Sequence, residues 1–586
     1  MSEGNIPRPE HPRPDFVRSR WINLNGKWGF AFDDKGIGER EKWYLSEKAF
    51  DRSIMVPFPY QSRLSGIHDE GFHDVIWYRR EFELPDEWHG GRILLHIGAV
   101  DYLSRVWVNG ELMGQHIGGY SPFDIDITKA VKPYENSLVV EAVDKHGDQP
   151  RGKQSSELKP SGCVYMRVSG IWQTVWLELA GDTYIRLFRL IPDVNREQLM
   201  ISVNLAGRTN RTRLDARIIL NGAELSKRSF TLKRSHSVLK MPLGYLRKWA
   251  PETPDLYRIE LNLFGDNDEP LDSVAGYFGV RTISVKGRRI LLNGKPYYLK
   301  LALDQGYYPD GLYTAPSDSA IKRDVEAVKE LGLNGVRKHQ MPPDPRYLYW
   351  ADKIGILVWE EMGDWGMSLV SRNLEPFLAE WRAIIDRDFN HPCVIAWVPF
   401  NERDPGETPE SLGFVRTVYS ETKKHDPTRL VIDNSGYNHT ESDIIDIHDY
   451  TAWQGGYVFT DGWRKAGKHG PYSPHRPLMF KGFKYSGQPV VISEYGGWGI
   501  KAFTPLIDRK FHAYGPPLED EYEFISKYRD VTLAIMSEPR VCGFCYTQLY
   551  DVEGEVNGFM TYDRRWKVSP EEIRRINLTS LNKHGE

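Results

Sequence analysis

The first 180 residues alternate between short apolar runs and turn residues. Runs such as "WYRREFELP", "GRILLHIGAV" and "NSLVVEAVD" have the pattern of half-buried strands, and Asn109-Gly110 in "WVNGELMG" is a hairpin turn signal between two strands. The run "SGIWQTVWLELA" closes this stretch. The pattern predicts an N-terminal β-sandwich of the jelly-roll type over residues 1–180.

Residues 181–284 continue the same rhythm of short strands. Examples are "LMISVNLA", "LDARIILNG" and "LYRIELNLF". The rhythm predicts an immunoglobulin-like β-sandwich. The Cys…Trp…Cys spacing of immunoglobulin domains is missing from this stretch, so the prediction depends on the number of strands alone.

From residue 285 onward, helical segments alternate with buried strands. The segment "SDSAIKRDVEAVKELG" predicts a helix that Ser317 or Asp318 caps and Gly332 ends. Apolar runs predict eight strands, at 297–303, 333–337, 356–360, 393–400, 429–433, 443–448, 489–493 and 540–547. This alternation predicts a (β/α)8 TIM barrel over residues 285–586. The alternative is a doubly wound sheet, which the lack of a glycine-rich loop after the first strand disfavours.

Two of these buried strands lead into a glutamate. Glu402 follows the fourth strand in "WVPFNER", and Glu494 ends the seventh in "PVVISEYGG". A buried carboxylate is costly unless it is paired or used, and the active site of a barrel lies at the carboxyl ends of its strands. Both side chains would project onto that face. Two facing carboxylates are what glycoside hydrolysis needs, one as proton donor and one as nucleophile or base.

Other polar residues also gather at the predicted strand ends. Each has an ordinary structural interpretation beside a functional one: Arg337 could pair with a barrel carboxylate, His339 could be a satisfied buried histidine, and Tyr450 could be a core residue. Glu360 and Glu361 cannot form the facing pair, because neighbouring residues on a strand point to opposite faces. The candidates at strand ends are Asp304, Arg337, His339, Asn401, His448, Tyr450 and Tyr546.

Composition narrows the class of protein. The formal net charge of −4, without a basic stripe, gives no sign of nucleic-acid binding. The N-terminus is polar and proline-rich, and no run reaches the length of a membrane span, so we expect a cytoplasmic protein without a membrane partner. The 18 tryptophans are typical either of large cores or of a sugar-binding surface, and Trp359, Trp365, Trp453 and Trp498 are candidates for an aglycone platform.

Several motifs together resemble the family 2 glycoside hydrolases, which include β-galactosidases, β-glucuronidases and β-mannosidases. They are "VWVNGELMGQHIGGYSPFDIDIT", "SGIWQTVWLE", "GVRTISVKGRRILLNGKP", "WVPFNER" and "VISEYGG", in a chain with the domain order of that family. The resemblance implies that Glu402 is the general acid/base and Glu494 the nucleophile of a retaining enzyme, with carboxyl groups about 5–5.5 Å apart. It also implies that Asn401 binds the sugar 2-hydroxyl and that Tyr450 hydrogen-bonds the nucleophile. His339, His448 and Arg337 would belong to the same pocket. We expect burial and the charge of Glu494 to raise the pKa of Glu402.

The sugar is less well indicated than the reaction. The β-glucuronidases have an Asn-x-Lys that holds the substrate carboxylate, and this chain has Glu555-Val556-Asn557 there. The missing lysine favours a neutral sugar, although Lys338 could supply a cation from another direction. Glu555 and Asp304 are further candidates for substrate binding. The first expectation is therefore an exo-acting β-galactosidase, with β-glucuronidase, β-mannosidase and α-L-arabinofuranosidase as alternatives.

The resemblance also bears on cofactors and partners. Galactosidase-type members use magnesium and sometimes sodium, but no metal ligands can be assigned here, and no cofactor is expected. Family members often form dimers or tetramers, so a homo-oligomer acting on a small-molecule or oligosaccharide substrate is expected.

Two other function classes remain. A carbohydrate-binding protein with an inactive barrel would have no need of Glu402 and Glu494. A metal-dependent barrel hydrolase would need a His-x-His or similar set of ligands at strand ends, and the sequence has none.

Overall fold

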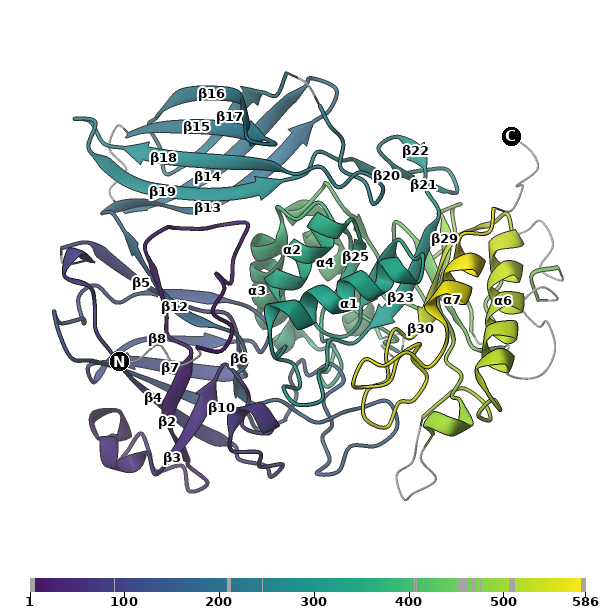
Figure 1. Ribbon diagram of the computed structural model, residues 1–586, viewed down its shortest axis with the longest axis horizontal. Coiled ribbons are helices and arrows are strands. Elements are labelled where there is room, and N and C mark those ends of the chain that lie inside the picture. The colour runs from purple at the N-terminus through teal and green to yellow at the C-terminus, as the bar shows by residue number, and fades with distance from the viewer. Residues whose placement is uncertain are drawn as a thin grey trace.

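The computed structural model describes residues 6–580 except 89, 208–211, 245, 405, 407, 452–461, 465–470, 475 and 505–511. Two β-sandwiches lie beside an α/β barrel, one at the lower left and one at the top of the view in Figure 1. The predicted multidomain fold, with a jelly-roll sandwich, an immunoglobulin-like sandwich and a TIM barrel, is therefore confirmed.

The N-terminal sandwich pairs a six-stranded sheet, in the order β3-β2-β4-β10-β7-β8, with a four-stranded sheet in the order β1-β12-β5-β9. One apolar core joins the two sheets, with Trp28 and Val106 from the larger sheet and Leu177 from the smaller. A short ladder pairs β11 with β6. The strands are β1 (Trp21–Asn23), β2 (Gly26–Phe32), β3 (Arg52–Val56), β4 (Val75–Phe82), β5 (Arg92–Ile97), β6 (Val100–Asp101), β7 (Leu103–Val108), β8 (Glu111–Ile117), β9 (Phe123–Asp126), β10 (Asn136–Val143), β11 (Gly170–Ile171) and β12 (Val175–Ala180).

The predicted hairpin turn at Asn109-Gly110 is present between β7 and β8. Both residues have left-handed backbone angles, φ 52° and φ 83°. These are the signs that a type I′ turn requires, and asparagine and glycine adopt them at the lowest cost.

The second sandwich packs the three-stranded sheet β13-β14-β17 against the four-stranded sheet β16-β15-β18-β19. Ile201 of β14 and Ile218 and Ile259 of the other sheet lie in its core, fully buried. The strands are β13 (Thr183–Asp193), β14 (Gln198–Gly207), β15 (Thr212–Leu220), β16 (Ala223–Leu232), β17 (His236–Pro242), β18 (Tyr257–Phe264) and β19 (Pro270–Phe278).

The barrel is an eight-stranded parallel sheet in the order β27-β26-β25-β24-β23-β30-β29-β28. The eight strands predicted from the sequence are all present. They are β23 (Leu299–Asp304), β24 (Gly335–Lys338), β25 (Leu357–Glu361), β26 (Val394–Val398), β27 (Leu430–Val431), β28 (Ile445–Asp449), β29 (Val490–Gly496) and β30 (Val541–Thr547). A small sheet of β20 (Ile283–Lys286), β21 (Arg289–Leu292) and β22 (Lys295–Pro296) precedes them.

Helices cover the outside of the barrel. The predicted helix at "SDSAIKRDVEAVKELG" is α1, with the Ser317 hydroxyl accepting a hydrogen bond from the backbone N–H of Ala320 and Gly332 at φ 69° after its end. The helices are α1 (Asp318–Glu330), α2 (Pro345–Ile354), α3 (Ser371–Asp388), α4 (Pro409–His425), α6 (Glu521–Ser537) and α7 (Pro570–Asn577). Short 3-10 helices are η1 (Trp43–Leu45), η2 (Glu47–Ala49), η3 (Arg63–Ser65), η4 (Asp86–Trp88) and η7 (Lys501–Phe503).

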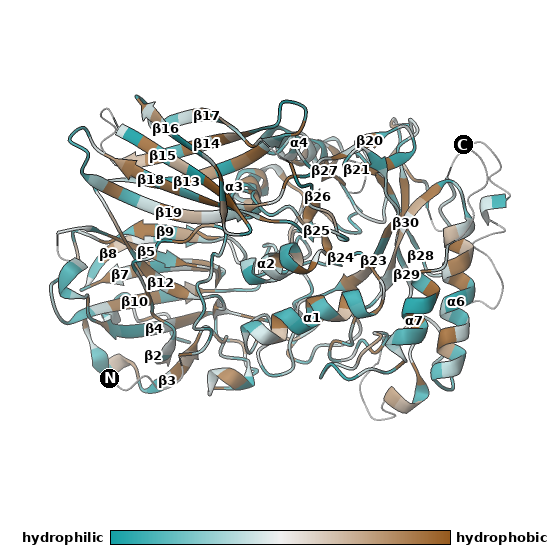
Figure 2. Cartoon of the chain, turned by 45° about the horizontal axis from the view of Figure 1, so that its top comes forward, coloured by the Kyte–Doolittle hydropathy of each residue, from teal (hydrophilic) through white to brown (hydrophobic). Residues whose placement is uncertain are grey.

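Hydropathy follows this architecture. In Figure 2 the barrel strands β23 and β30 are largely hydrophobic, whereas α1 and α7 carry many hydrophilic residues. Strands covered on both faces need this continuous apolar character. No helix in the described part of the chain combines the length and apolarity that a membrane crossing requires.

The register of the barrel strands sets the polar residues at one end. Asp304 is paired with Lys338 across β23 and β24, and His448 is paired with Glu494 across β28 and β29. Polar side chains from strands far apart in the sequence therefore meet at the carboxyl ends of the barrel.

Candidate active site

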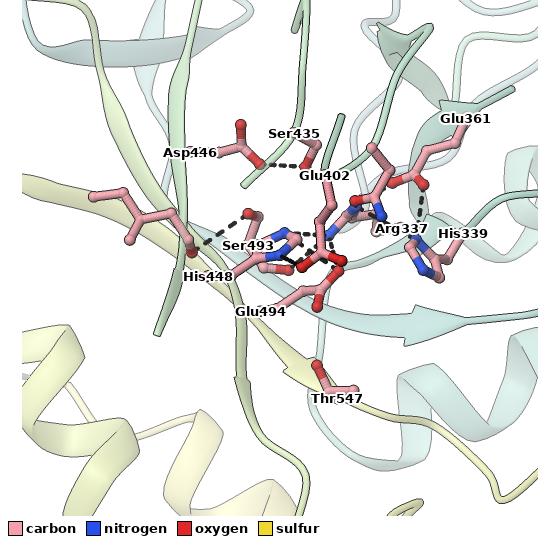
Figure 3. A network of polar contacts seen from close by, with 12 residues as sticks. Arg337, His339, Glu361, Glu402, Ser435, Asp446, His448, Ser493, Glu494 and Thr547 are labelled. Atoms are coloured by element: carbon pink, nitrogen blue, oxygen red, sulfur yellow. Dashed lines mark hydrogen bonds and ion pairs between the residues drawn. The ribbon is translucent and has the colours of Figure 1, made fainter. Parts of the chain in front are cut away.

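Glu402 and Glu494 come together at the carboxyl ends of the barrel strands. Glu494 lies on β29, and Glu402 lies just beyond the end of β26. One carboxylate oxygen of each lies within 4.8 Å of the other and of a ring nitrogen of His448. Figure 3 shows the two side chains side by side. The Glu402 side chain keeps 26% of its surface exposed against 6% for Glu494, so a ligand can reach it.

His448 contacts both glutamates. Its Nδ1 lies 2.6 Å from Oε1 of Glu402, and its Nε2 lies 3.2 Å from Oε1 of Glu494. Gly436 makes room for the ring: a Cβ atom there would lie 2.2 Å from it, and the φ of +72° also favours glycine. A side chain at position 436 would therefore displace the histidine from the two carboxylates.

The backbone of Glu402 has an unusual conformation. Its φ is 51°, in the left-handed region, which costs a non-glycine residue about 1–3 kcal/mol. The N–H of Glu402 donates to the carbonyl of Ser435 at 2.9 Å, and the N–H of Ser435 donates to the carbonyl of Phe400 at 2.8 Å. These hydrogen bonds hold the strained residue with its side chain directed toward Glu494.

Glu494 is fixed by two donors. Nη1 of Arg337 lies 2.7 Å from its Oε1, and the hydroxyl of Tyr450 donates to its Oε2 at 2.6 Å. Burial and the charge of Glu494 raise the pKa of Tyr450 well above its ordinary value, so the tyrosine keeps its proton and remains a donor. The carboxylate is thereby oriented and its negative charge stabilised.

A second layer holds Arg337 in place. Its guanidinium is completely buried and also contacts Glu361 and the side-chain oxygen of Asn401. Glu361 in turn lies beside His339: Nδ1 of His339 is 2.8 Å from Oε2 of Glu361. Burial, followed by the charges of Lys153 and Arg337, lowers the pKa of His339 well below its ordinary value, so this ring is neutral.

Asn401 presents an unused donor. Its side-chain oxygen accepts from Arg337, and within the described ranges its buried Nδ2 has no hydrogen-bond partner. Buried donors are normally paired, because an unpaired one costs about 1–3 kcal/mol. The donor is therefore available to a substrate oxygen.

Family comparisons cover most of the chain. "Glycosyl hydrolases family 2, sugar binding domain" matches residues 21–179, "Glycosyl hydrolases family 2" matches 183–281, and "Glycosyl hydrolases family 2, TIM barrel domain" matches 283–502. The chain belongs to glycosyl hydrolase family 2. It is a glycoside hydrolase.

Relatives within family 2 differ in the sugar that their names give. A β-galactosidase of Thermoanaerobacter pseudethanolicus is 29% identical over 65% of this chain, but the match covers 52% of that protein. A β-glucuronidase of Rattus norvegicus is 26% identical over 86% of this chain and 82% of its own length. A β-glucuronidase of Paenibacillus borealis is 25% identical over 87% of each.

Solved family 2 structures share the fold. The β-glucuronidase from Ruminococcus gnavus, without a ligand, superimposes with a TM-score of 0.78 at 22% identity, over 97% of this chain and 100% of its own. The Lactobacillus rhamnosus β-glucuronidase gives 0.77 at 22% identity, over 97% and 98%.

The expected pKa of Glu402 is wrong for this site. Burial does push the pKa upward, but the His448 ring and the Lys153 ammonium outweigh it and hold the pKa at about 2 instead of raising it. The prediction weighed Glu494 and burial but not the effect of His448, and Lys153 was not among the predicted site residues.

Asp304 is bonded to two neighbouring side chains. Its Oδ1 accepts from Nζ of Lys338 at 2.7 Å and from the hydroxyl of Tyr550 at 2.5 Å. Both members of the Asp304–Lys338 pair are buried. Its Oδ2 has no hydrogen-bond partner in the described part of the chain, so sugar binding by Asp304 stays a prediction, whereas Lys338 is not a free cation for the substrate.

Tyr546 and Glu555 also have partners of their own. The Tyr546 ring lies in an aromatic cluster with Trp498, Phe524 and Phe559, and its hydroxyl donates to a backbone carbonyl. Tyr546 is thus a core residue rather than part of the pocket. Glu555 is buried and accepts hydrogen bonds from the side chains of Tyr165, Gln305 and Asn557.

The four candidate tryptophans also differ in whether they lie in the core or near the glutamates. Trp359 and Trp498 are buried in the barrel core, and Trp453 lies outside the described residues. Trp365 is partly exposed and donates its indole N–H to the carbonyl of Asn401 at 2.9 Å. Of these four, Trp365 is the one that the described structure places beside the glutamates.

Sequence reasoning missed Lys153, which comes from the loop between β10 and β11 of the N-terminal sandwich. Its Nζ lies 4.1 Å from the centroid of the Trp365 ring. The only sequence signal is one of two lysines in "PRGKQSSELKPSG", a stretch that has no periodicity and is far from the barrel strands.

Glu402, His448 and Glu494 are also the one group of three metal-capable side chains found in the described residues. A cation between them would have to compete with the Arg337 guanidinium, which already lies 2.7 Å from Glu494. The contacts of these three residues therefore suit proton transfer and nucleophilic attack rather than a metal site.

Proposed function

We propose that this protein is a retaining, exo-acting β-glycosidase in which Glu494 is the nucleophile and Glu402 the general acid/base. The observation that carries the proposal is the separation of the two carboxylates, whose nearest oxygens lie within 4.8 Å. Retaining enzymes hold their carboxyl groups about 5–5.5 Å apart, whereas inverting enzymes leave about 6.5–9.5 Å for a water molecule.

The first step forms a covalent glycosyl-enzyme. An oxygen of Glu494 attacks the anomeric carbon and bonds to it, while the bond from that carbon to the leaving oxygen breaks. The leaving oxygen takes a proton from Glu402. Arg337 and Tyr450 orient the attacking carboxylate through the contacts at 2.7 and 2.6 Å.

In this proposal, Glu402 receives the proton that it donates through its hydrogen bond with His448. The hydrogen bond of 2.6 Å between Oε1 and Nδ1 gives a short path along which the proton reaches Glu402 when it is transferred to the substrate. This arrangement makes a low pKa of Glu402 compatible with acid catalysis.

The second step hydrolyses the intermediate. Glu402, now ionised, accepts a proton from water, the water oxygen bonds to the anomeric carbon, and the ester bond to Glu494 breaks. Two displacements at the same carbon retain the β configuration. The free Nδ2 of Asn401 suits a hydrogen bond to the sugar 2-hydroxyl in both steps.

For the sugar, we propose a terminal β-glucuronosyl residue in place of the β-galactosyl residue expected from the sequence. The support comes from the relatives: matches that cover more than four fifths of both chains carry the name β-glucuronidase. The β-galactosidase match covers about half of that protein, at 52%. The residue Asn557, where glucuronidases have lysine, is the observation that favours a neutral sugar instead.

A panel of p-nitrophenyl glycosides tests both parts. It contains the β-glucuronide, β-galactoside, β-glucoside, β-mannoside and α-L-arabinofuranoside, with Glu494→Gln as the blank. We expect the β-glucuronide to be cleaved fastest, with retention of configuration by NMR of the first product. Preferred cleavage of a neutral sugar would overturn the choice of sugar alone, and inversion or silence across the panel would overturn the retaining mechanism.

A further inference from the structure

The loop between β10 and β11 of the N-terminal sandwich is bonded to the barrel next to the catalytic residues. The N–H of Arg151 donates to the carbonyl of Trp365 at 2.7 Å, and the N–H of Gly152 donates to the carbonyl of Gly363 at 2.9 Å. A Cβ atom at Gly152 would lie 2.2 Å from the carbonyl oxygen of Gln340, so only glycine permits this approach. The backbone therefore fixes where Lys153, the next residue, enters the barrel opening.

Lys153 is a buried cation among acidic groups. Only 7% of its surface is exposed, and its ammonium lies against the Trp365 ring. Burial lowers the pKa of Lys153, but the nearby Cys163, Glu555, Glu402 and Glu494 raise it more, so the lysine stays charged. The charges of Glu402 and Glu494 are thus among those that act on Lys153.

Lys153 has no anionic partner at ion-pair distance in the described residues, although its ammonium lies over the Trp365 ring. Among the residues that the structure describes, no hydrogen bond or ion pair is found for its Nζ, whereas Arg337 is bonded to Glu361 and Glu494 and Lys338 to Asp304. Burying a charge without a partner is costly, since the desolvation is not compensated. Of these three cations, Lys153 is the one left for an anionic group of a ligand.

Glu555 is not the anionic partner of Lys153. Its Oε2 accepts from Tyr165 and from Gln305, and its Oε1 accepts from Asn557 at 3.0 Å. The carboxylate is satisfied by neutral donors, and it is not within ion-pair distance of Lys153 in the described structure. Asn557 itself is buried and uncharged, with its oxygen bonded to Gln548 at 2.8 Å.

We propose that Lys153, contributed by the N-terminal sandwich, binds the carboxylate of a uronic acid glycone and so determines the substrate class of the barrel site. This inference rests on the proposed β-glucuronidase function. It explains how a site without a lysine at position 557 accepts an anionic sugar. It also gives the N-terminal sandwich a direct part in specificity.

The test compares substrates that differ only at C6. A β-glucuronide carries a carboxylate there and a β-glucoside a hydroxymethyl group, so the ratio of their kcat/KM values isolates recognition of the charge. Lys153→Met removes the charge and keeps the length of the side chain. Lys153→Arg keeps the charge, and Lys159→Met changes an exposed lysine of the same loop as the matched control.

We expect Lys153→Met to lower kcat/KM for p-nitrophenyl β-glucuronide about 100-fold, chiefly through KM, as expected for the loss of one partner from a buried charge pair. The value for the β-glucoside should change less than about threefold, and Lys159→Met should change neither. Lys153→Arg should recover part of the glucuronide activity. Unchanged melting temperatures would show that each variant is folded.

Three outcomes separate the two proposals. Equal losses on both substrates would overturn the role of Lys153 as a carboxylate anchor. The proposal that the wild-type protein is a β-glucuronidase would still stand. A wild-type enzyme that cleaves neutral glycosides but not the glucuronide would overturn the choice of sugar and the anchor together. If nothing is cleaved, titration with D-glucuronic acid and D-glucose decides the anchor, because tighter binding of the acid that is lost in Lys153→Met needs no catalysis.

Discussion

The Nδ1 atom of His448 lies 2.6 Å from Oε1 of Glu402, on the far side of the ring from the nitrogen that faces Glu494. One imidazole thereby contacts both the proposed acid/base and the proposed nucleophile. The contact exists because β28 and β29 are paired in parallel with His448 opposite Glu494, and because Gly436 leaves room for the ring.

Replacing His448 should raise the pKa of Glu402. The ring is the largest of the influences that hold this pKa down at about 2, so in His448→Gln burial acts with less opposition. Infrared difference spectra between pH 7 and pH 4 should show a protonated carboxyl that is missing from a Glu402→Gln/His448→Gln double variant. An unchanged titration of Glu402 would contradict the assigned pairing.

Replacing Glu494, the proposed nucleophile, should abolish turnover. An added anion should restore cleavage by attacking the anomeric carbon from the side opposite the leaving group. We expect Glu494→Ala to lose about 10⁴-fold or more in kcat. With azide and an activated aryl β-glycoside, the small anion takes the place of the carboxylate and yields the α-glycosyl azide. Formation of the β-azide by this variant would show that Glu494 is not the nucleophile.

Removal of the acid/base should give the complementary result. Glu402→Ala should lose about 10²–10⁴-fold on a poor leaving group, because general acid catalysis contributes that much. A dinitrophenyl glycoside, whose leaving group needs no proton, should still form the glycosyl-enzyme in a rapid burst. Azide should then give the β-glycosyl azide, and equal losses on both leaving groups would argue against the role.

The Asp304–Lys338 pair should stabilise the barrel rather than bind substrate. Both side chains are buried with Nζ 2.7 Å from Oδ1, so Asp304→Asn leaves a buried cation and should cost about 3–5 kcal/mol. Lys338→Met in the Asp304→Asn background should recover part of the melting temperature. Asp563→Asn, at an exposed ion pair, is the control and should change it little. A change in KM without a loss of stability would support Asp304 as a substrate ligand.

Glu380 should make the contact between the N-terminal sandwich and the barrel dependent on pH. It lies on α3 and accepts from the backbone N–H of Tyr120 at 2.8 Å, and burial raises its pKa to about 7 although backbone donors oppose this. A raised pKa means that its contribution is complete below the unfolded pKa of about 4.5 and is lost as pH rises through 7.

The measurement is the melting temperature at pH 5 and pH 8. Glu380→Gln cannot ionise, so we expect it to lose less stability between these values than the wild type, by about 3 kcal/mol in the unfolding free energy. Other groups titrate equally in both proteins and cancel in the difference. Parallel pH profiles would show that Glu380 does not titrate in this range.

The sequence by itself determined the three domains in order, the eight barrel strands and the two glutamates. The periods of strands and helices are visible in the local pattern of hydrophobic residues. A carboxylate at the end of a buried strand is visible in the same pattern, because it interrupts an apolar run. The position of five further residues at the carboxyl face was also predictable, because each lies at a strand end of a barrel whose carboxyl face is fixed by topology: Asn401, Arg337, His339, His448 and Tyr450.

Only the tertiary structure decided which strand-end residues face the pocket and what lies opposite them. Tyr546 and Asp304 are at strand ends but turn to the core and to Lys338, since side-chain direction and pairing depend on neighbours far away in the chain. Lys153 lies against Trp365 because a loop of another domain packs onto the barrel, and no local pattern encodes such packing. The low pKa of Glu402 follows from the same long-range placement of His448 and Lys153 around one carboxylate.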